Sequence, residues 1–128
     1  MMNGRVIRLP WPPSINNYRA VVRGRLITSR DGRAYRRAAV DALMCCPRWS
    51  GRLHVEIDLH PPNRRRFDVD NRIKPILDAC TEAGFWGDDS QVDHLVVRRC
   101  AVHPPDGLAV LRIRKISEPL TRRPRKLQ

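Results

Sequence analysis

Residues 53–83 read LHVEIDLHPPNRRRFDVDNRIKPILDACTEA, and this stretch decides the fold class. Apolar and polar residues alternate over 53–60, which predicts a half-buried β-strand. Gly84 stands where a glycine commonly ends a helix, and Pro75 fits a helix only within its first turn. Between them, apolar residues recur at helical spacing over 72–83, which predicts a helix that buries Ile73, Ile76, Leu77 and Cys80.

The preceding sequence predicts three further elements. We expect a strand over residues 5–9, because the prolines that follow cannot continue a β-ladder. Residues 14–17 are expected to form a loop, and short apolar segments on both sides of Gly24 predict a hairpin. An apolar stripe from Tyr35 to Cys46 predicts a helix, for which two residues are candidate N-caps, Ser29 and Asp31.

Two strands are expected after the second helix, over residues 92–102 and 108–116. The turn between them is short, so we expect them to be antiparallel neighbours. The expected fold class is α+β (mixed α/β), a small mixed sheet with two helices in a single layer pair. We expect this domain to cover residues 1–116 and a basic tail to cover residues 117–128.

The composition indicates a basic protein with a polyanionic partner. The chain has 128 residues and a formal net charge of +12, and its basic residues gather toward both ends. This favours nucleic acid as the partner. There is no apolar segment of membrane-spanning length and no secretion signal, so we expect a cytoplasmic protein that does not associate with membranes. The cysteines form no Cys-x-x-Cys motif, and we interpret all four as small apolar residues: Cys45, Cys46, Cys80 and Cys100.

Acidic residues occur on both sides of the predicted helix at 72–83. Asp68 and Asp70 would point the same way in an extended segment, because they are two residues apart. The chain returns toward them after the helix, so we expect Asp88 or Asp89 to lie beside the first pair. Carboxylate oxygens are ligands that suit Mg²⁺, and a bound cation would also relieve the repulsion between them.

Lys74 lies one helical turn beyond Asp70, so its ammonium group can reach back toward these acids and stabilise charge on a leaving oxygen. An ordinary ion pair with Asp78 is the alternative. An isolated Asp-x-Asp motif also occurs in nucleotide-sugar transferases, but this chain is short for their nucleotide-binding domain, and we expect no nucleotide cofactor. The histidines lack metal-ligand spacing and are interpreted as strand or turn residues, with His60 the least certain: His54, His60, His94 and His103.

These motifs together resemble the RusA-type Holliday-junction resolvases, many of which are carried by phages and prophages. Residues 9–16 (LPWPPSIN) look like the family's N-terminal signature. Residues 68–74 (DVDNRIK) look like its Asp-x-Asp-Asn-x-x-Lys motif, and residues 88–92 (DDSQV) like its Asp-Asp-x-Gln-Val motif. Phe67 departs from the family pattern, which usually has a basic residue there, so the preceding arginines would have to supply that phosphate contact.

The resemblance implies roles for individual residues. The catalytic acids that hold the metal would be Asp68, Asp70 and Asp89, and Lys74 would be the catalytic lysine. Supporting roles fall to Asn71, Asp88 and Asn16. We expect the arginines near these motifs and in the hairpin to bind backbone phosphates: Arg64, Arg65, Arg66, Arg72, Arg19, Arg23 and Arg25.

The resemblance also implies an activity. The implied protein is a homodimeric endodeoxyribonuclease that depends on Mg²⁺, or on Mn²⁺ in its place. It would resolve four-way (Holliday) junctions in recombination and repair. Two symmetric nicks in branched DNA suit a dimer with two-fold symmetry. The alternative is a non-catalytic DNA-binding protein whose acidic loop is merely solvated.

Overall fold

A computed structural model of the chain describes residues 4–117. Nearly all of the expected basic tail, residues 118–128, lies outside the described residues. None of the helices within 4–117 is both long and apolar enough to cross a membrane. In chain order the elements are β1 (Gly4–Pro10), α1 (Ile15–Tyr18), β2 (Arg19–Val22), β3 (Arg25–Thr28), α2 (Arg30–Leu43), β4 (Leu53–His60), the 3₁₀ helix η1 (Val69–Arg72), α3 (Ile73–Glu82), the 3₁₀ helix η2 (Asp89–Gln91), β5 (Val92–Arg99) and β6 (Leu108–Lys115).

The main sheet is mixed, as the sequence predicts, with the strand order β1-β6-β4-β5. β4 pairs with β5 in parallel and with β6 antiparallel, and β1 pairs antiparallel with β6. The parallel pair follows from the β4–α3–β5 connection, because a helical crossover returns the chain in the same direction. The α+β fold class is therefore confirmed.

The expected pairing of the last two strands is wrong. β5 and β6 run in opposite directions, but β4 lies between them. The connection is longer than the turn that the sequence suggests, and hydrogen bonds from Cys100 N to the Leu59 carbonyl and from His103 N to the Pro61 carbonyl guide it past the end of β4. Two strand spacings amount to only about 10 Å, which such a segment spans easily. β4 and β6 are the two inner strands, and one face of β4 is wholly apolar and fully buried: Leu53, Val55, Ile57 and Leu59.

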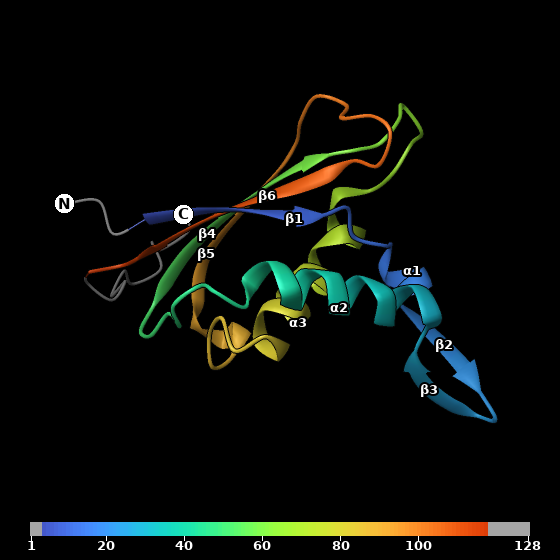
Figure 1. Cartoon of the computed structure of the whole chain (residues 1–128), viewed down its shortest axis with the longest axis horizontal. Helices are drawn as coiled ribbons and strands as arrows, with labels where there is room; N and C mark the ends of the chain where they lie inside the picture. The colour runs from blue at the N-terminus through green and yellow to red at the C-terminus, as the bar shows by residue number, and fades with distance from the viewer. Residues whose placement is uncertain (1–3, 118–128) are drawn as a thin grey trace, which may run out of the picture.

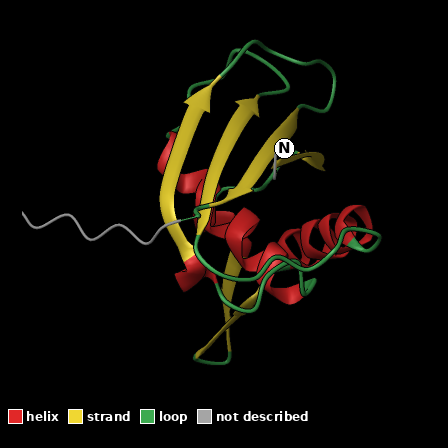
Figure 2. Cartoon of the chain, turned by 90° about the vertical axis from the view of Figure 1, so that its left-hand side faces the viewer, coloured by secondary structure: helices red, strands yellow, loops and turns green. Residues whose placement is uncertain are grey.

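The two long helices cover one face of this sheet (Figures 1 and 2). α2 packs against β1 and α3, and the core between helices and sheet includes the fully buried Trp86 and Phe85. These two aromatic residues therefore belong to the core. The other face of the sheet carries the alternate side chains of β4, which are polar or charged, and none of the described helices covers it.

The N-terminal part differs from expectation at residues 14–17. These residues do not form a loop, because Ser14 caps the one-turn helix α1 through a 3.2 Å hydrogen bond from Asn17 N. The hairpin is confirmed, and β2 and β3 extend away from the sheet (Figure 1). Ser29 is the cap of α2, with Gly32 N donating to its hydroxyl at 3.0 Å. Gly32 is needed for packing, because a Cβ atom there would lie 2.4 Å from the Tyr18 carbonyl oxygen.

Both ends of α3 agree with the sequence. The helix begins at Ile73, one residue later than predicted, so Pro75 lies in the first turn, where its missing N–H leaves no bond unmade. Ala83 is the C-cap, and Gly84 follows with a φ of +74°, a conformation that favours glycine. α3 therefore runs between the two loops that carry the predicted catalytic acids.

Candidate active site

Asp68 and Asp70 lie on the segment that leads into α3, but this segment is not extended as expected. Asp68 is the residue before η1, and its carbonyl oxygen accepts a 3.2 Å hydrogen bond from Asn71 N. That bond closes a 3₁₀ turn, so the two carboxylates are not arranged with strand spacing. Both side chains are exposed, and within residues 4–117 neither carboxylate makes a hydrogen bond or ion pair.

The second acidic loop gives Asp88 and Asp89 different roles. The Asp88 carboxylate caps η2 by accepting a 3.1 Å hydrogen bond from Ser90 N, and this bonding holds its pKa below the usual value. Gln91 completes a capping box, since its side-chain oxygen accepts from Asp88 N at 3.1 Å. The Gln91 amide group also donates to the Trp49 and Gly51 carbonyls. Asp88 and Gln91 thus shape the loop and leave the Asp89 carboxylate available.

Lys74 connects the two loops. Its Nζ atom lies 2.9 Å from Asp78 Oδ1 and 3.4 Å from Asp89 Oδ2, so both contacts considered from the sequence are present. The hydrogen bond to Asp78, with smaller contributions from the charges of Asp78 and Asp89, raises the pKa of Lys74. The ammonium group therefore stays charged near neutral pH beside Asp89.

The three predicted acids belong to neighbouring elements, although their oxygens do not converge on one point. η1 contacts β5 and α3, and η2 contacts α3. Within residues 4–117, the one group of three or more possible metal ligands with ligand atoms within 4.8 Å of one another lies elsewhere. The donor set itself fits a hard divalent cation: Asp68 and Asp70 offer carboxylates that are unpaired within the described residues, and Asp89 lies next to a cation that limits its repulsion with them.

Comparison of the sequence with known proteins shows the family of the chain. The model of the family "Endodeoxyribonuclease RusA" matches residues 10–110. The chain belongs to this family. It is 43% identical over 106 residues to the crossover junction endodeoxyribonuclease RusA of Escherichia coli K12, covering 76% of this chain and 84% of that protein. The protein of the same name from Shigella sonnei is also 43% identical, and that from Enterobacteria phage 82 is 42% identical, with the same coverage of both chains.

Membership of the RusA family confirms the resemblance and the expectation of an endodeoxyribonuclease. It leaves the individual roles of Asp68, Asp70, Asp89 and Lys74 as predictions, along with the supporting roles of Asn71 and Asp88. Asn16 is exposed on α1, which contacts both η1 and α3, so this supporting residue also adjoins the acidic segment.

Phe67 fixes the position of the acidic segment. The Arg99 guanidinium lies 4.2 Å from the centre of its ring and also donates a hydrogen bond to the Phe67 carbonyl. Trp11 meets the ring edge-on, with 5.3 Å between ring centres. The residue before Asp68 is thus held by Arg99 at the end of β5 and by Trp11 in the N-terminal segment. Sequence analysis missed Arg99, because nothing in its spacing places it next to Phe67.

Arg72 has a structural role in addition to any contact with DNA. Its Nη1 atom donates to the Pro12 carbonyl at 2.7 Å, and its guanidinium lies 5.2 Å from the centre of the Trp11 ring. Burial lowers the pKa of Arg72, and its Nε atom is buried without a partner among the described residues. Arg72 therefore joins the N-terminal signature to η1, and its place among the phosphate-binding arginines stays a prediction.

The other predicted phosphate-binding arginines are exposed. In the loop after β4, Arg65 and Arg66 line a pocket of about 230 Å³ beside Phe67. The arginines of the β2–β3 hairpin stand on an element that extends away from the sheet (Figure 1). All six have exposed side chains and are free to meet a polyanion: Arg19, Arg23, Arg25, Arg64, Arg65 and Arg66.

Proposed function

We propose that this protein is a divalent-metal-dependent endodeoxyribonuclease that resolves four-way DNA junctions by paired nicks. The observation that carries the proposal is the contact between Lys74 and Asp89 on elements that adjoin the 3₁₀ turn of the other two acids, whose carboxylates have no partner within residues 4–117. This arrangement combines the charged ammonium group of Lys74 with carboxylate oxygens that suit Mg²⁺ or Mn²⁺. The names of the relatives, crossover junction endodeoxyribonucleases, supply the substrate.

Three carboxylates would hold the metal: Asp68, Asp70 and Asp89. When bound, the divalent ion supplies polarisation of the scissile phosphate and a water of lowered pKa. Water attacks phosphorus, the bond to the 3′ oxygen breaks, and the products are a 5′ phosphate and a 3′ hydroxyl. Lys74 keeps a positive charge near the departing oxygen, and Asp78 holds the lysine in place from the next helical turn.

The substrate would be held through its backbone. Exposed arginines in the hairpin and in the loop after β4 can neutralise phosphates without reading bases. A four-way junction presents two equivalent scissile phosphates, and this chain carries one candidate site in its described part. We therefore infer a homodimer with two-fold symmetry, so that two sites make two nicks.

The test uses a synthetic mobile four-way junction and a linear duplex of matched sequence, each incubated with Mg²⁺, with Mn²⁺ and with EDTA. We expect cleavage of the junction alone, and only with metal. Asp70→Asn should abolish cleavage while junction binding stays the same or tightens, because the substitution removes a negative charge near the DNA.

Light scattering of the free protein and of the junction complex tests the dimer. Two copies per junction are expected. If the wild-type protein binds the junction and never cuts it in any of these metals, the alternative of a non-catalytic DNA-binding protein is correct. Cleavage by Asp70→Asn at the wild-type rate would instead show that the acids are wrongly assigned.

A further inference from the structure

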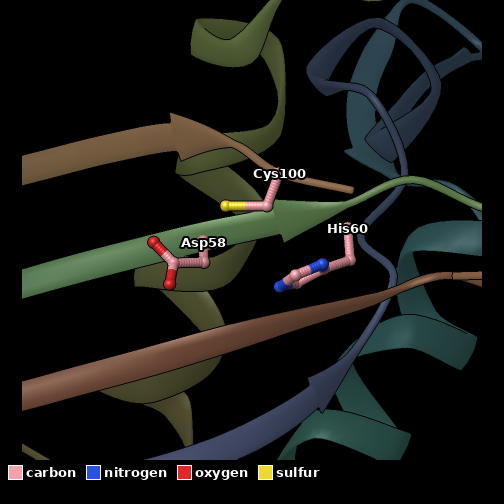
Figure 3. Close-up of side chains that lie close together, drawn as sticks. All are labelled: Asp58, His60 and Cys100. Carbon is pink, nitrogen blue, oxygen red and sulfur yellow. The ribbon is translucent and has the colours of Figure 1, made fainter. Parts of the chain in front are cut away.

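A second group of possible metal ligands lies on the open face of the sheet. Asp58 and His60 are two residues apart on β4, so both side chains point away from the helices, and Cys100 lies directly after β5 (Figure 3). One ligand atom from each lies within 4.8 Å of the others. This arrangement departs from the sequence-based interpretation of Cys100 and His60, which gave neither residue a metal-binding role.

The His60 ring is oriented for ligation. Its Nδ1 atom lies 2.8 Å from the Ala101 carbonyl oxygen. A carbonyl oxygen only accepts, so Nδ1 carries a proton, and in the neutral ring Nε2 keeps its lone pair. A backbone carbonyl that fixes the ring of a histidine in this way is the usual outer partner of a metal-binding histidine. This contact is independent of the Cys100 and Asp58 side chains.

The sheet separates this group from the candidate active site. Arg98 pairs with Asp58 in the β4–β5 register, and its side chain bonds the Asp58 carboxylate on the open face. The next residue, Arg99, contacts Phe67, the residue before the first catalytic acid. Successive strand residues point to opposite faces, so the two groups of ligands lie on opposite sides of β5.

We propose that Asp58, His60 and Cys100 bind a Zn²⁺ ion through a carboxylate oxygen, Nε2 and Sγ. A thiolate and an imidazole together favour Zn²⁺ over Mg²⁺. On binding, the Cys100 thiol gives its proton to solvent and the sulfur forms the new bond, with no change of oxidation state. Tetrahedral bonds of the usual length place ligand atoms about 3.3–3.6 Å apart, so the three side chains must close slightly. Water would complete the coordination.

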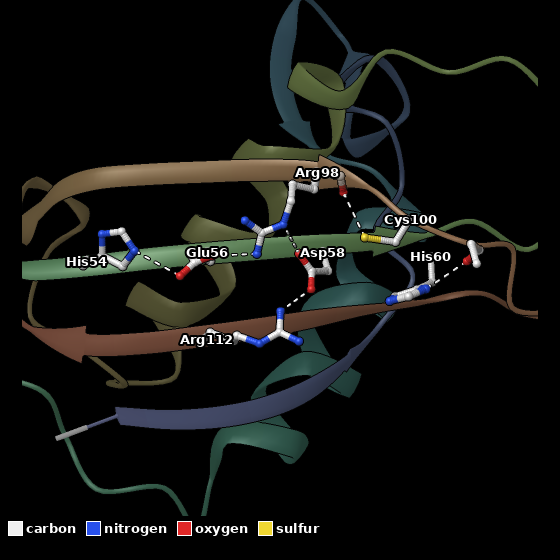
Figure 4. Close-up of polar contacts among 8 residues, drawn as sticks. His54, Glu56, Asp58, His60, Arg98, Cys100 and Arg112 are labelled. Carbon is white, nitrogen blue, oxygen red and sulfur yellow. Dashed lines mark hydrogen bonds and ion pairs between the residues drawn. The ribbon is translucent and has the colours of Figure 1, made fainter. Parts of the chain in front are cut away.

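Two arginines compete with the ion for Asp58 (Figure 4). Arg98 Nε donates to Asp58 Oδ1 at 2.9 Å, and Arg112 bonds Asp58 Oδ2. Arg98 also bonds Glu56, so it keeps one partner when it releases Asp58. Both arginine side chains are more than 40% exposed and are free to turn toward solvent. Metal binding would therefore replace an arginine bond to the Asp58 carboxylate with a bond to the ion.

Occupation of the site would stabilise a defined part of the fold. Cys100 begins the connection that passes over the end of β4, and His60 is the last residue of β4 before the arginine-rich loop. A bond through one ion would join the base of that loop to the connection after β5. We therefore expect bound Zn²⁺ to raise the thermal unfolding temperature of the full chain.

The test titrates the purified full chain with Co²⁺, which replaces Zn²⁺ and reports thiolate ligation through a charge-transfer band. We expect the band in the wild type, its displacement by Zn²⁺, and its loss in Cys100→Ser and in His60→Ala. Cys45→Ser, which removes an exposed cysteine outside the group, is the matched control and should keep the band. Cys100 and His60 are partly exposed, and circular dichroism verifies that both variants fold before titration.

Two further variants separate this proposal from others. Arg98→Gln should bind Co²⁺ severalfold more tightly, because a competing cation is gone. Asp70→Asn should keep the band whether or not the catalytic assignment is right, so failure of the nuclease proposal leaves this one standing. A wild type without a thiolate band, or a band that persists in Cys100→Ser, would overturn the proposed site.

Discussion

Lys74→Gln separates the catalytic interpretation of the lysine from the structural one. The wild-type ammonium contacts Asp78 at 2.9 Å and Asp89 at 3.4 Å, and 47% of the lysine side chain is exposed. Exposed pairs of this kind contribute about 0–1 kcal/mol to folding stability, and an i,i+4 pair about 0.3–0.5 kcal/mol. We therefore expect the free energy of unfolding to fall by less than about 1 kcal/mol.

The expected effect on cleavage is much larger. Removal of one group that stabilises charge in a transition state typically lowers the rate about 10²–10³-fold. Single-turnover cleavage of the mobile junction, with enzyme in excess, measures this rate without interference from product release. Urea unfolding of the same preparations gives the stability, and gel shift gives junction binding.

Asp78→Asn is the matched control, because it removes the closer partner of Lys74 and leaves Asp89 in place. We expect it to change the cleavage rate only a few-fold. Equal losses of rate in Lys74→Gln and Asp78→Asn would show that the lysine acts through its helical ion pair. Near wild-type cleavage by Lys74→Gln would refute the catalytic role outright.

Three further predictions concern binding and stability. Junction affinity should fall steeply as salt rises, because the net charge is +12, and a flat response in gel shifts would contradict phosphate binding by the arginines. Gly32→Ala should lower the free energy of unfolding by about 1–3 kcal/mol, since its Cβ would lie 2.4 Å from the Tyr18 carbonyl oxygen, whereas Gly4→Ala has room and should be neutral in urea titrations. Burial opposes ionisation of Asp58, yet bonds from Arg112 and Arg98 outweigh it and lower its pKa, so this residue adds stability above the unfolded-state pKa that is lost as pH falls through the folded-state pKa. Asp58→Asn should therefore flatten the acid side of a stability–pH curve, and an unchanged curve would contradict this.

The positions of the helices and strands along the chain were predictable, because local sequence patterns determine them. The apolar stripes and the cap residues Ser29 and Gly84 give α2 and α3 with few errors. The strand order was not predictable in the same way, because β4 and β6 each bury an apolar face and local patterns do not show which strands lie side by side. β4 separates β5 from β6 although a short connection joins those two.

Contacts between distant residues were the least accessible from the sequence. Arg99 and Phe67 are far apart along the chain, and only the parallel β4–β5 pairing brings the end of β5 to the acidic segment. The group of Asp58, His60 and Cys100 arises from the same pairing. Spacing rules for metal sites search along one segment, and they miss ligands that come from two strands.

The choice between Asp88 and Asp89 shows how local chemistry can assign roles that spacing leaves open. Asp88 and Gln91 form a capping box, in which the Asp88 carboxylate accepts from the backbone of η2 and the Gln91 side chain reaches back to the Asp88 N–H group. The Asp88 carboxylate is engaged in capping η2, and the hydrogen bonds that it accepts there lower its pKa. Asp89 alone is then left to face Lys74. We therefore predict that the motif contains both a positioning residue, Asp88, and a metal ligand, Asp89, and that the order of the two acids decides which is which.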